Sequence, residues 1–213
     1  MIKLFLVIPC YKEQEVLPET SARLKRKMQQ MIEQNRISPA SRVVFVNDGS
    51  TDKTWEMIQE LHKEDRLFSG IDLSRNRGHQ NALLAGLMTV KDIADVTISM
   101  DADLQDDIDA IDQMLDQYFN GCDIVYGVRS KRQTDTFFKR FTAESFYHLM
   151  RWLGADIVFN HADYRLMSQR ALQGLSQFKE VNLFLRGLVP LVGYRSGIVT
   201  YERHERFAGE SKY

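Results

Sequence analysis

The stretch that decides the fold is Val96-Thr97-Ile98-Ser99-Met100-Asp101-Ala102-Asp103-Leu104-Gln105-Asp106, an apolar run followed directly by spaced carboxylates. The apolar residues predict a buried strand, so the carboxylates lie where that strand ends. Alternate residues of a strand point to the same side, and Asp101 and Asp103 can therefore converge on one point. Such a pair suits Mg²⁺ or Mn²⁺, whose coordination shell is completed by water and substrate phosphates. The sequence thus predicts a metal site on Asp101 and Asp103.

Asp106 and Asp107 follow this pair and have a simpler interpretation. A carboxylate just before a helix commonly caps it by accepting a hydrogen bond from one of its first amides. We therefore expect these two residues to cap the helix that follows. The same interpretation, extended to the whole acidic turn, leaves the spacing of Asp101 and Asp103 unexplained because a cap needs only one carboxylate.

Apolar patterns along the chain alternate between the strand and helix periods. This alternation predicts an α/β fold with a mostly parallel, doubly wound sheet and helices on both faces. No repeat or linker interrupts it, so residues 1–213 are expected to form a single domain. Strands are expected at 4–8, 43–46, 68–73, 96–100, 124–128, 164–167 and 198–201, and helices at 16–35, 54–64, 80–88, 108–119, 172–175 and 183–192.

The composition excludes several classes of protein. The formal net charge of -1 gives no general attraction to nucleic acid. Cys10 and Cys122 are isolated, which fits two small core residues in a reducing compartment rather than a disulfide framework. No segment approaches the ~20 apolar residues of a membrane-spanning helix.

Three further polar loops follow predicted strands, at residues 9–15, 47–52 and 74–80. Ligands bind at the carboxyl ends of strands in open α/β sheets. Tyr11 offers a wall for a nucleotide base, Asp48 and Glu13 offer acceptors, and the Asp101/Asp103 pair offers a metal site for a diphosphate. A tight turn with a helix cap is the alternative for residues 48–50. The chain lacks the glycine-rich dinucleotide and P-loop motifs, which disfavours those two modes of nucleotide binding.

Six short motifs carry a resemblance that covers the whole chain. They are Val7-Ile8-Pro9-Cys10-Tyr11-Lys12-Glu13, Val46-Asn47-Asp48-Gly49-Ser50-Thr51-Asp52, Asn76-Arg77-Gly78, Met100-Asp101-Ala102-Asp103-Leu104-Gln105, Ala162-Asp163-Tyr164-Arg165-Leu166 and Arg206-Phe207-Ala208-Gly209-Glu210-Ser211-Lys212-Tyr213. In this order they resemble the family-2 nucleotide-sugar glycosyltransferases, and within them the polyprenyl-phosphate sugar transferases. Two departures are Lys12, where many relatives have Asn, and Asp106-Asp107, where relatives have His or Asp followed by Pro.

The resemblance implies a GT-A fold that binds a nucleoside-diphosphate sugar and Mg²⁺ or Mn²⁺. Asp163 is then the candidate base, or a residue that only orients the acceptor, and Asp103 and Arg206 act on the diphosphate. A polar cap on a turn is the structural alternative for Asp163. Arg129 and His161 are further candidates on the acceptor side. The resemblance assigns Asp101 and Asp103 to the metal, and Pro9, Tyr11, Glu13, Asp48, Gly78, Asp101, Gln105, Arg206 and Lys212 to the nucleotide sugar.

The expected function is inverting transfer of a sugar from a UDP-sugar, or a GDP-sugar, to a polyprenyl phosphate at the cytoplasmic membrane face. Residues 1–128 would bind the donor and residues 129–213 the acceptor, in a chain that continues into hydrophobic helices. The basic and aromatic segment 129–152 would face lipid headgroups, or else pack on the sheet as a surface helix. The alternatives are a soluble family-2 enzyme that extends a polysaccharide and a nucleotide-sugar-binding module without turnover. Self-association of the chain into an oligomer is left as an open alternative.

Overall fold

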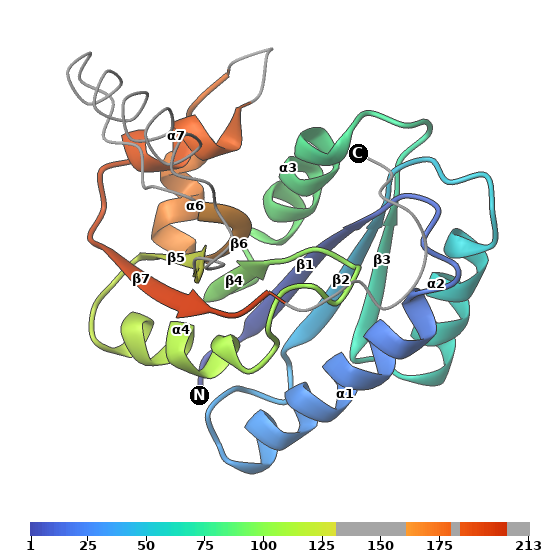
Figure 1. Ribbon diagram of the computed structural model, residues 1–213, viewed down its shortest axis with the longest axis horizontal. Coiled ribbons are helices and arrows are strands. Elements are labelled where there is room, and N and C mark those ends of the chain that lie inside the picture. Colours follow the sequence, from blue (N-terminus) through green and yellow to red (C-terminus); the bar gives the residue numbers. More distant parts are fainter. Residues whose placement is uncertain (131–160, 180–183, 204–213) are drawn as a thin grey trace, which may run out of the picture.

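The computed structural model describes residues 1–130, 161–179 and 184–203 (Figure 1). Over these residues the chain forms one sheet of seven strands in the order β3-β2-β1-β4-β6-β5-β7. The strands are β1 (Leu4–Cys10), β2 (Arg42–Asn47), β3 (Phe68–Asp72), β4 (Val96–Ser99), β5 (Ile124–Arg129), β6 (His161–Ser168) and β7 (Ser196–Tyr201).

Six of the described strands run in the same direction, and β6 runs against them. β1 pairs in parallel with β2 and β4, β2 with β3, and β5 with β7. β6 is inserted between β4 and β5 and is antiparallel to both. The predicted mostly parallel α/β sheet is confirmed. The strand expected at 164–167 is longer, because it begins at His161.

Helices cover both faces of the sheet (Figure 1). Alternation along β1 sends Leu4 and Leu6 into one core and Phe5 and Val7 into the other. The first core is closed by α1 (Leu17–Glu33), α2 (Thr54–Glu64) and α4 (Ala110–Phe119). The second is closed by α3 (His79–Val90), α6 (Gln169–Leu175) and α7 (Leu185–Leu191). The sheet is therefore doubly wound, as predicted.

Close packing fixes α3 against the first two strands. A Cβ atom on Gly86 would lie 2.4 Å from Cγ1 of Val7 and 2.7 Å from Cγ2 of Val46. Only a glycine allows the helix to approach the sheet this closely. The first turn of α3 is thereby held beside the carboxyl ends of β1 and β2. In the part of the chain that the structure describes, no helix is both long and apolar enough to cross a membrane.

Candidate active site

The reversed direction of β6 brings its first residues to the edge where β1, β2 and β4 end. Ser99 at the end of β4 pairs with Arg165, and its hydroxyl donates to the carbonyl oxygen of Asp163 at 2.5 Å. Asp163 therefore lies beside the turn that carries Asp101. The first residues of β6 and the loops that follow β1, β2 and β4 therefore form one site.

Asp48 holds two of the strand-end loops together. Its buried carboxylate accepts hydrogen bonds from the amides of Arg77 at 2.6 Å and Gly78 at 3.0 Å. The neighbouring Gly49 has a φ of 64°, and a Cβ there would lie 2.4 Å from the carbonyl carbon of Arg75. The loop after β3 thus rests directly on the loop after β2. A carboxylate has lone pairs beyond these two hydrogen bonds, so Asp48 can also accept from a ligand.

The loop after β1 is fixed by the turn that precedes α2. The amide of Lys12 donates to the Ser50 hydroxyl, and the amide of Glu13 donates to the Thr54 hydroxyl, both at 2.9 Å. Lys12 has a φ of 55°, in the left-handed region that asparagine tolerates better than lysine. This conformation accounts for the asparagine expected at this position in relatives. Pro9 lies within β1, and Tyr11 lies beneath the Lys12 ammonium, which is 5.3 Å from its ring centre.

The Asp101/Asp103 turn has an excess of negative charge. Burial, followed by the charges of Asp106, Asp103 and Asp163, raises the pKa of Asp101 to about 6, although His79 opposes the shift. A divalent cation would relieve this repulsion, so the carboxylates fit the predicted metal. Among the described residues, no group of three or more His, Cys, Asp or Glu side chains could hold a metal ion. Water and donor phosphates would therefore complete its shell.

Asp163 is surrounded by donors from two helices. Nε and Nη2 of Arg186 on α7 donate to its two carboxylate oxygens at 3.2 and 3.1 Å, and Nε2 of Gln80 on α3 donates at 3.1 Å. Nε2 of His79 lies 3.4 Å from Asp163 and 3.8 Å from Asp101. Burial raises the pKa of Asp163, but His79 and Arg186 outweigh it and hold that pKa well below its usual range.

His79, Gln80 and Arg186, which the structure places against Asp163, were not among the predicted site residues. His79 and Gln80 belong to the loop 74–80, yet they form the first turn of α3. Arg186 is the only charged residue of the apolar segment 183–192, and that was the signal that could have found it. Burial lowers the pKa of His79, but the nearby carboxylates of Asp163 and Asp101 raise it above its ordinary value.

The prediction that Asp106 caps the next helix is wrong. The helix begins at Ala110, and Asp106 is buried with its carboxylate accepting from the Tyr201 hydroxyl at 2.5 Å. Its other oxygen accepts from the amide of Asp101 at 3.4 Å, and Nη2 of Arg129 lies 3.7 Å away. Asp106 therefore links β7 to the turn that carries Asp101. The local pattern hid this role because Tyr201 is far away in sequence.

The sequence profile of Glycosyl transferase family 2 matches residues 5–175, which include every strand and helix that shapes this edge up to α6. The chain belongs to glycosyl transferase family 2. The uncharacterized glycosyltransferase YkoT of Bacillus subtilis is 50% identical over 99% of this chain and 62% of its own length. The bactoprenol glucosyl transferase of Shigella phage SfV is 36% identical over 100% of this chain and 67% of its own length.

Solved structures establish that this family 2 chain has the GT-A fold. Mannosyltransferase PcManGT from Pyrobaculum calidifontis, in complex with GDP-Man and Mn²⁺, aligns with a TM-score of 0.60 and 16% identity over 94% of this chain and 56% of that one. Glucosyl-3-phosphoglycerate synthase from Mycobacterium tuberculosis, with Mn²⁺, UDP and phosphoglyceric acid, gives 0.59 and 13% over 98% and 72%. The chain spans 62% of the length of YkoT and 64% of the length of another Bacillus subtilis relative, the uncharacterized glycosyltransferase YkcC.

Two predicted site residues of this family 2 chain lie outside the described residues. Arg206 and Lys212 belong to the segment 204–213, and the basic and aromatic segment is described only at its first two residues. Gln105, expected near the donor, accepts a hydrogen bond from Nη2 of Arg203, which is the last described residue before that segment. Gly78 precedes α3 with a φ of 85°. The roles of Arg206 and Lys212 stay predictions.

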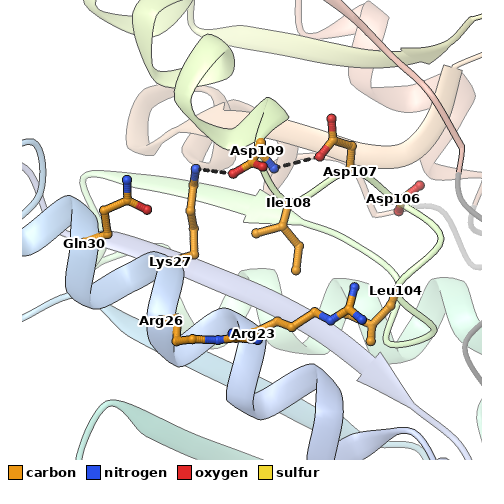
Figure 2. Close-up of a pocket in the computed structure, with 9 residues that line it drawn as sticks. All are labelled: Arg23, Arg26, Lys27, Gln30, Leu104, Asp106, Asp107, Ile108 and Asp109. Carbon is orange, nitrogen blue, oxygen red and sulfur yellow. Dashed lines mark hydrogen bonds and ion pairs between the residues drawn. The ribbon is translucent and has the colours of Figure 1, made fainter.

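A pocket of about 390 Å³ lies between α1 and the loop 104–109 (Figure 2). Arginines 23 and 26 line its α1 side, and Asp107 and Asp109 line the other. Lys27 reaches across it, donating to Asp109 at 2.7 Å and to Asp112 at 2.5 Å. The positive side chains on α1 therefore face the carboxylates of the loop across the pocket. Its lining includes Leu104 and Asp106, which follow the Asp101/Asp103 pair in the same loop.

Proposed function

We propose that this chain transfers a sugar with inversion from a UDP-sugar to a polyprenyl phosphate at the cytoplasmic membrane face, assisted by Mg²⁺ or Mn²⁺. The bactoprenol glucosyl transferase relative supports the acceptor class. The M. tuberculosis structure with UDP and Mn²⁺, which shares the fold, supports the donor and metal class. The site geometry supports separate groups of residues for the nucleotide sugar and for the acceptor.

Asp101 and Asp103 would hold the metal, and Asp48, Tyr11 and Glu13 would surround the nucleoside. A bound divalent cation supplies charge neutralisation for the departing nucleoside diphosphate. Asp48 fixes the loop of Arg77 and Gly78, so the base would pack against a loop that is already ordered before the nucleotide binds. Arg206 and Lys212 would add positive charge to the diphosphate from the terminal segment.

The observation that carries the proposal is the state of Asp163. Its two oxygens accept from Arg186 and Gln80, and His79 and Arg186 together lower its pKa well below its usual range, which makes it a poor proton acceptor. A sugar hydroxyl acceptor would need a base, whereas a phosphate monoester has a second pKa near ~6 and is largely dianionic at neutral pH. The site therefore suits an acceptor that needs no deprotonation. Asp163 orients groups around the nucleophile instead of taking a proton.

The test is transfer of radiolabelled sugar from UDP-glucose to undecaprenyl phosphate in anionic vesicles, with Mn²⁺ or with EDTA. We expect labelled lipid with Mn²⁺ only. Asp103→Ala should abolish it, and Asp92→Ala, which removes a 68%-exposed carboxylate before β4, should leave the rate unchanged. Labelled soluble polysaccharide without labelled lipid would instead identify a polysaccharide-extending enzyme. Tight UDP binding without transfer to either acceptor would identify a binding module.

A further inference from the structure

Arg186 is the cation that connects the buried Asp163 to solvent. Its guanidinium forks around the carboxylate, and the Arg186 side chain is 44% exposed while that of Asp163 is 7% exposed. Nε and one N–H of Nη2 are used in the fork, and arginine carries further donors on Nη1 and Nη2. Among the described residues, the guanidinium makes no other hydrogen bond or ion pair.

The other cations near Asp163 face inward. The Arg165 side chain is 1% exposed, and its guanidinium lies over the Tyr126 ring at 5.5 Å. His79 is 18% exposed and lies between two carboxylates. Of the positive groups within 4 Å of Asp163 in the described chain, Arg186 is thus the one whose free donors can meet a ligand arriving from solvent.

An exposed aromatic side chain lies directly before the same turn of α7. Phe184, which immediately precedes the helix, is 58% exposed. Its ring packs over the backbone of Gly187, because a Cβ there would lie 2.6 Å from Cδ1 of Phe184. An exposed aromatic ring two residues from an anion-binding arginine matches a ligand that joins a phosphate to a hydrocarbon chain.

We propose that the first turn of α7 binds the acceptor, with Arg186 on its phosphate and Phe184 against its first isoprene units. Asp163 is then a positioning residue that aims the guanidinium. This inference rests on the proposed function and adds the residues that select the acceptor. A phosphate oxygen forms the bond to the anomeric carbon, and the bond from that carbon to the nucleoside diphosphate breaks. The diphosphate leaves with the electron pair, and no proton has to move.

The first experiment separates acceptor binding from donor binding in the full chain, with geranyl phosphate as the acceptor and UDP as the donor-site probe. Arg186→Ala should raise the KM for geranyl phosphate by at least about tenfold and leave the Kd for UDP within about twofold, because the lost contact is charge-assisted and on the acceptor side. Arg186→Lys keeps the charge but not the fork, so it should recover part of the loss.

Arg170 is the matched control. It makes the same two-point contact, donating through Nε and Nη2 to the two carboxylate oxygens of Asp123. Asp123 lies directly before β5 and Arg170 lies in α6, so this pair is at the end of the sheet opposite to Asp163, which lies beside the carboxyl ends of the strands. Arg170→Ala should leave both the KM for geranyl phosphate and the Kd for UDP unchanged.

The second experiment tests the apolar contact. Phe184→Ala should raise the KM for geranyl phosphate several-fold, with a smaller effect on the shorter dimethylallyl phosphate. Leu191→Ala removes an exposed apolar side chain at the other end of α7, 65% exposed, and should change neither value. Equal effects of the two substitutions would refute the contact with the prenyl chain.

The outcomes distinguish this inference from the function on which it rests. If the unmodified chain transfers sugar to geranyl phosphate and Arg186→Ala does not raise the acceptor KM, the assignment of α7 is wrong and the proposed function stands. Loss of UDP affinity in parallel with acceptor affinity would make Arg186 a structural residue. If Arg186→Ala does not fold, Arg186→Lys and Phe184→Ala decide. No transfer to any prenyl phosphate overturns both proposals.

Discussion

Replacing Asp48 by alanine should release the loop after β3 and destabilise the whole protein. The Asp48 carboxylate is fully buried and accepts from two amides, those of Arg77 and Gly78. Hydrogen bonds to a charged group contribute about 1.5–3 kcal/mol each, which sets an upper range of about 3–6 kcal/mol for the pair. Both amides belong to a surface loop that water can reach once it moves. We therefore expect Asp48→Ala to lower the free energy of unfolding by about 2–4 kcal/mol.

Urea unfolding followed by tryptophan fluorescence measures this loss. Asp48→Asn keeps one acceptor oxygen but turns an amide group toward the second N–H, so its loss should be about 1–3 kcal/mol. Asp107→Ala is the control, because its carboxylate accepts one exposed amide, that of Asp109, and should cost less than about 1 kcal/mol. An unfolding free energy for Asp48→Ala within about 0.5 kcal/mol of the unmodified chain would refute the reasoning.

Three further substitutions probe the frame around the site. Gly49→Ala adds a Cβ against the backbone of the loop after β3 at a positive φ. The free energy of unfolding in urea should therefore fall by about 1–3 kcal/mol, and an unchanged urea midpoint would contradict this. Lys27→Met keeps the buried stem but removes the ammonium between α1 and α4, and thermal unfolding should report a loss of about 1–3 kcal/mol, whereas a gain would show the ion pairs to be dispensable. Burial raises the pKa of Asp123, but Arg170 and Ser168 lower it below its ordinary value. The stability lost in Asp123→Asn should therefore be full at about pH 6 and shrink toward about pH 3, and a pH-independent difference would contradict this cause.

Local patterns predicted most of the fold. The runs around β1, β2 and β4 are apolar on both faces, as strands covered by helices must be, and each ends in a polar loop. The positions of Asp48, Asp101 and Asp103 after those strands followed from the same rule, and the structure places all three at one edge.

The antiparallel direction of β6 could not be predicted from the sequence. An apolar run such as Tyr164–Met167 predicts a strand but not which neighbours it pairs with, because pairing depends on the rest of the sheet. Because β6 is antiparallel to its neighbours, Asp163 lies at the same end of the sheet as Asp101 and Asp103, the predicted metal ligands. Arg186 on α7 also contacts Asp163 there. The misassignment of Asp106 has the same origin. A capping pattern is local, and the buried bond to Tyr201 that displaced it joins residues almost a hundred positions apart.

The inserted strand also governs how the protein can be made. β5 has no contact with β4 in the sheet order, since β6 lies between them. A ribosome that has released residues 1–130 has therefore produced β5 without a sheet neighbour and β4 with one bare edge. Exposed edges of this kind invite pairing with other chains until the missing strand arrives. A gene split after Arg129 would thus give fragments that aggregate rather than two working halves, and co-expression of the pieces would be needed to recover soluble protein.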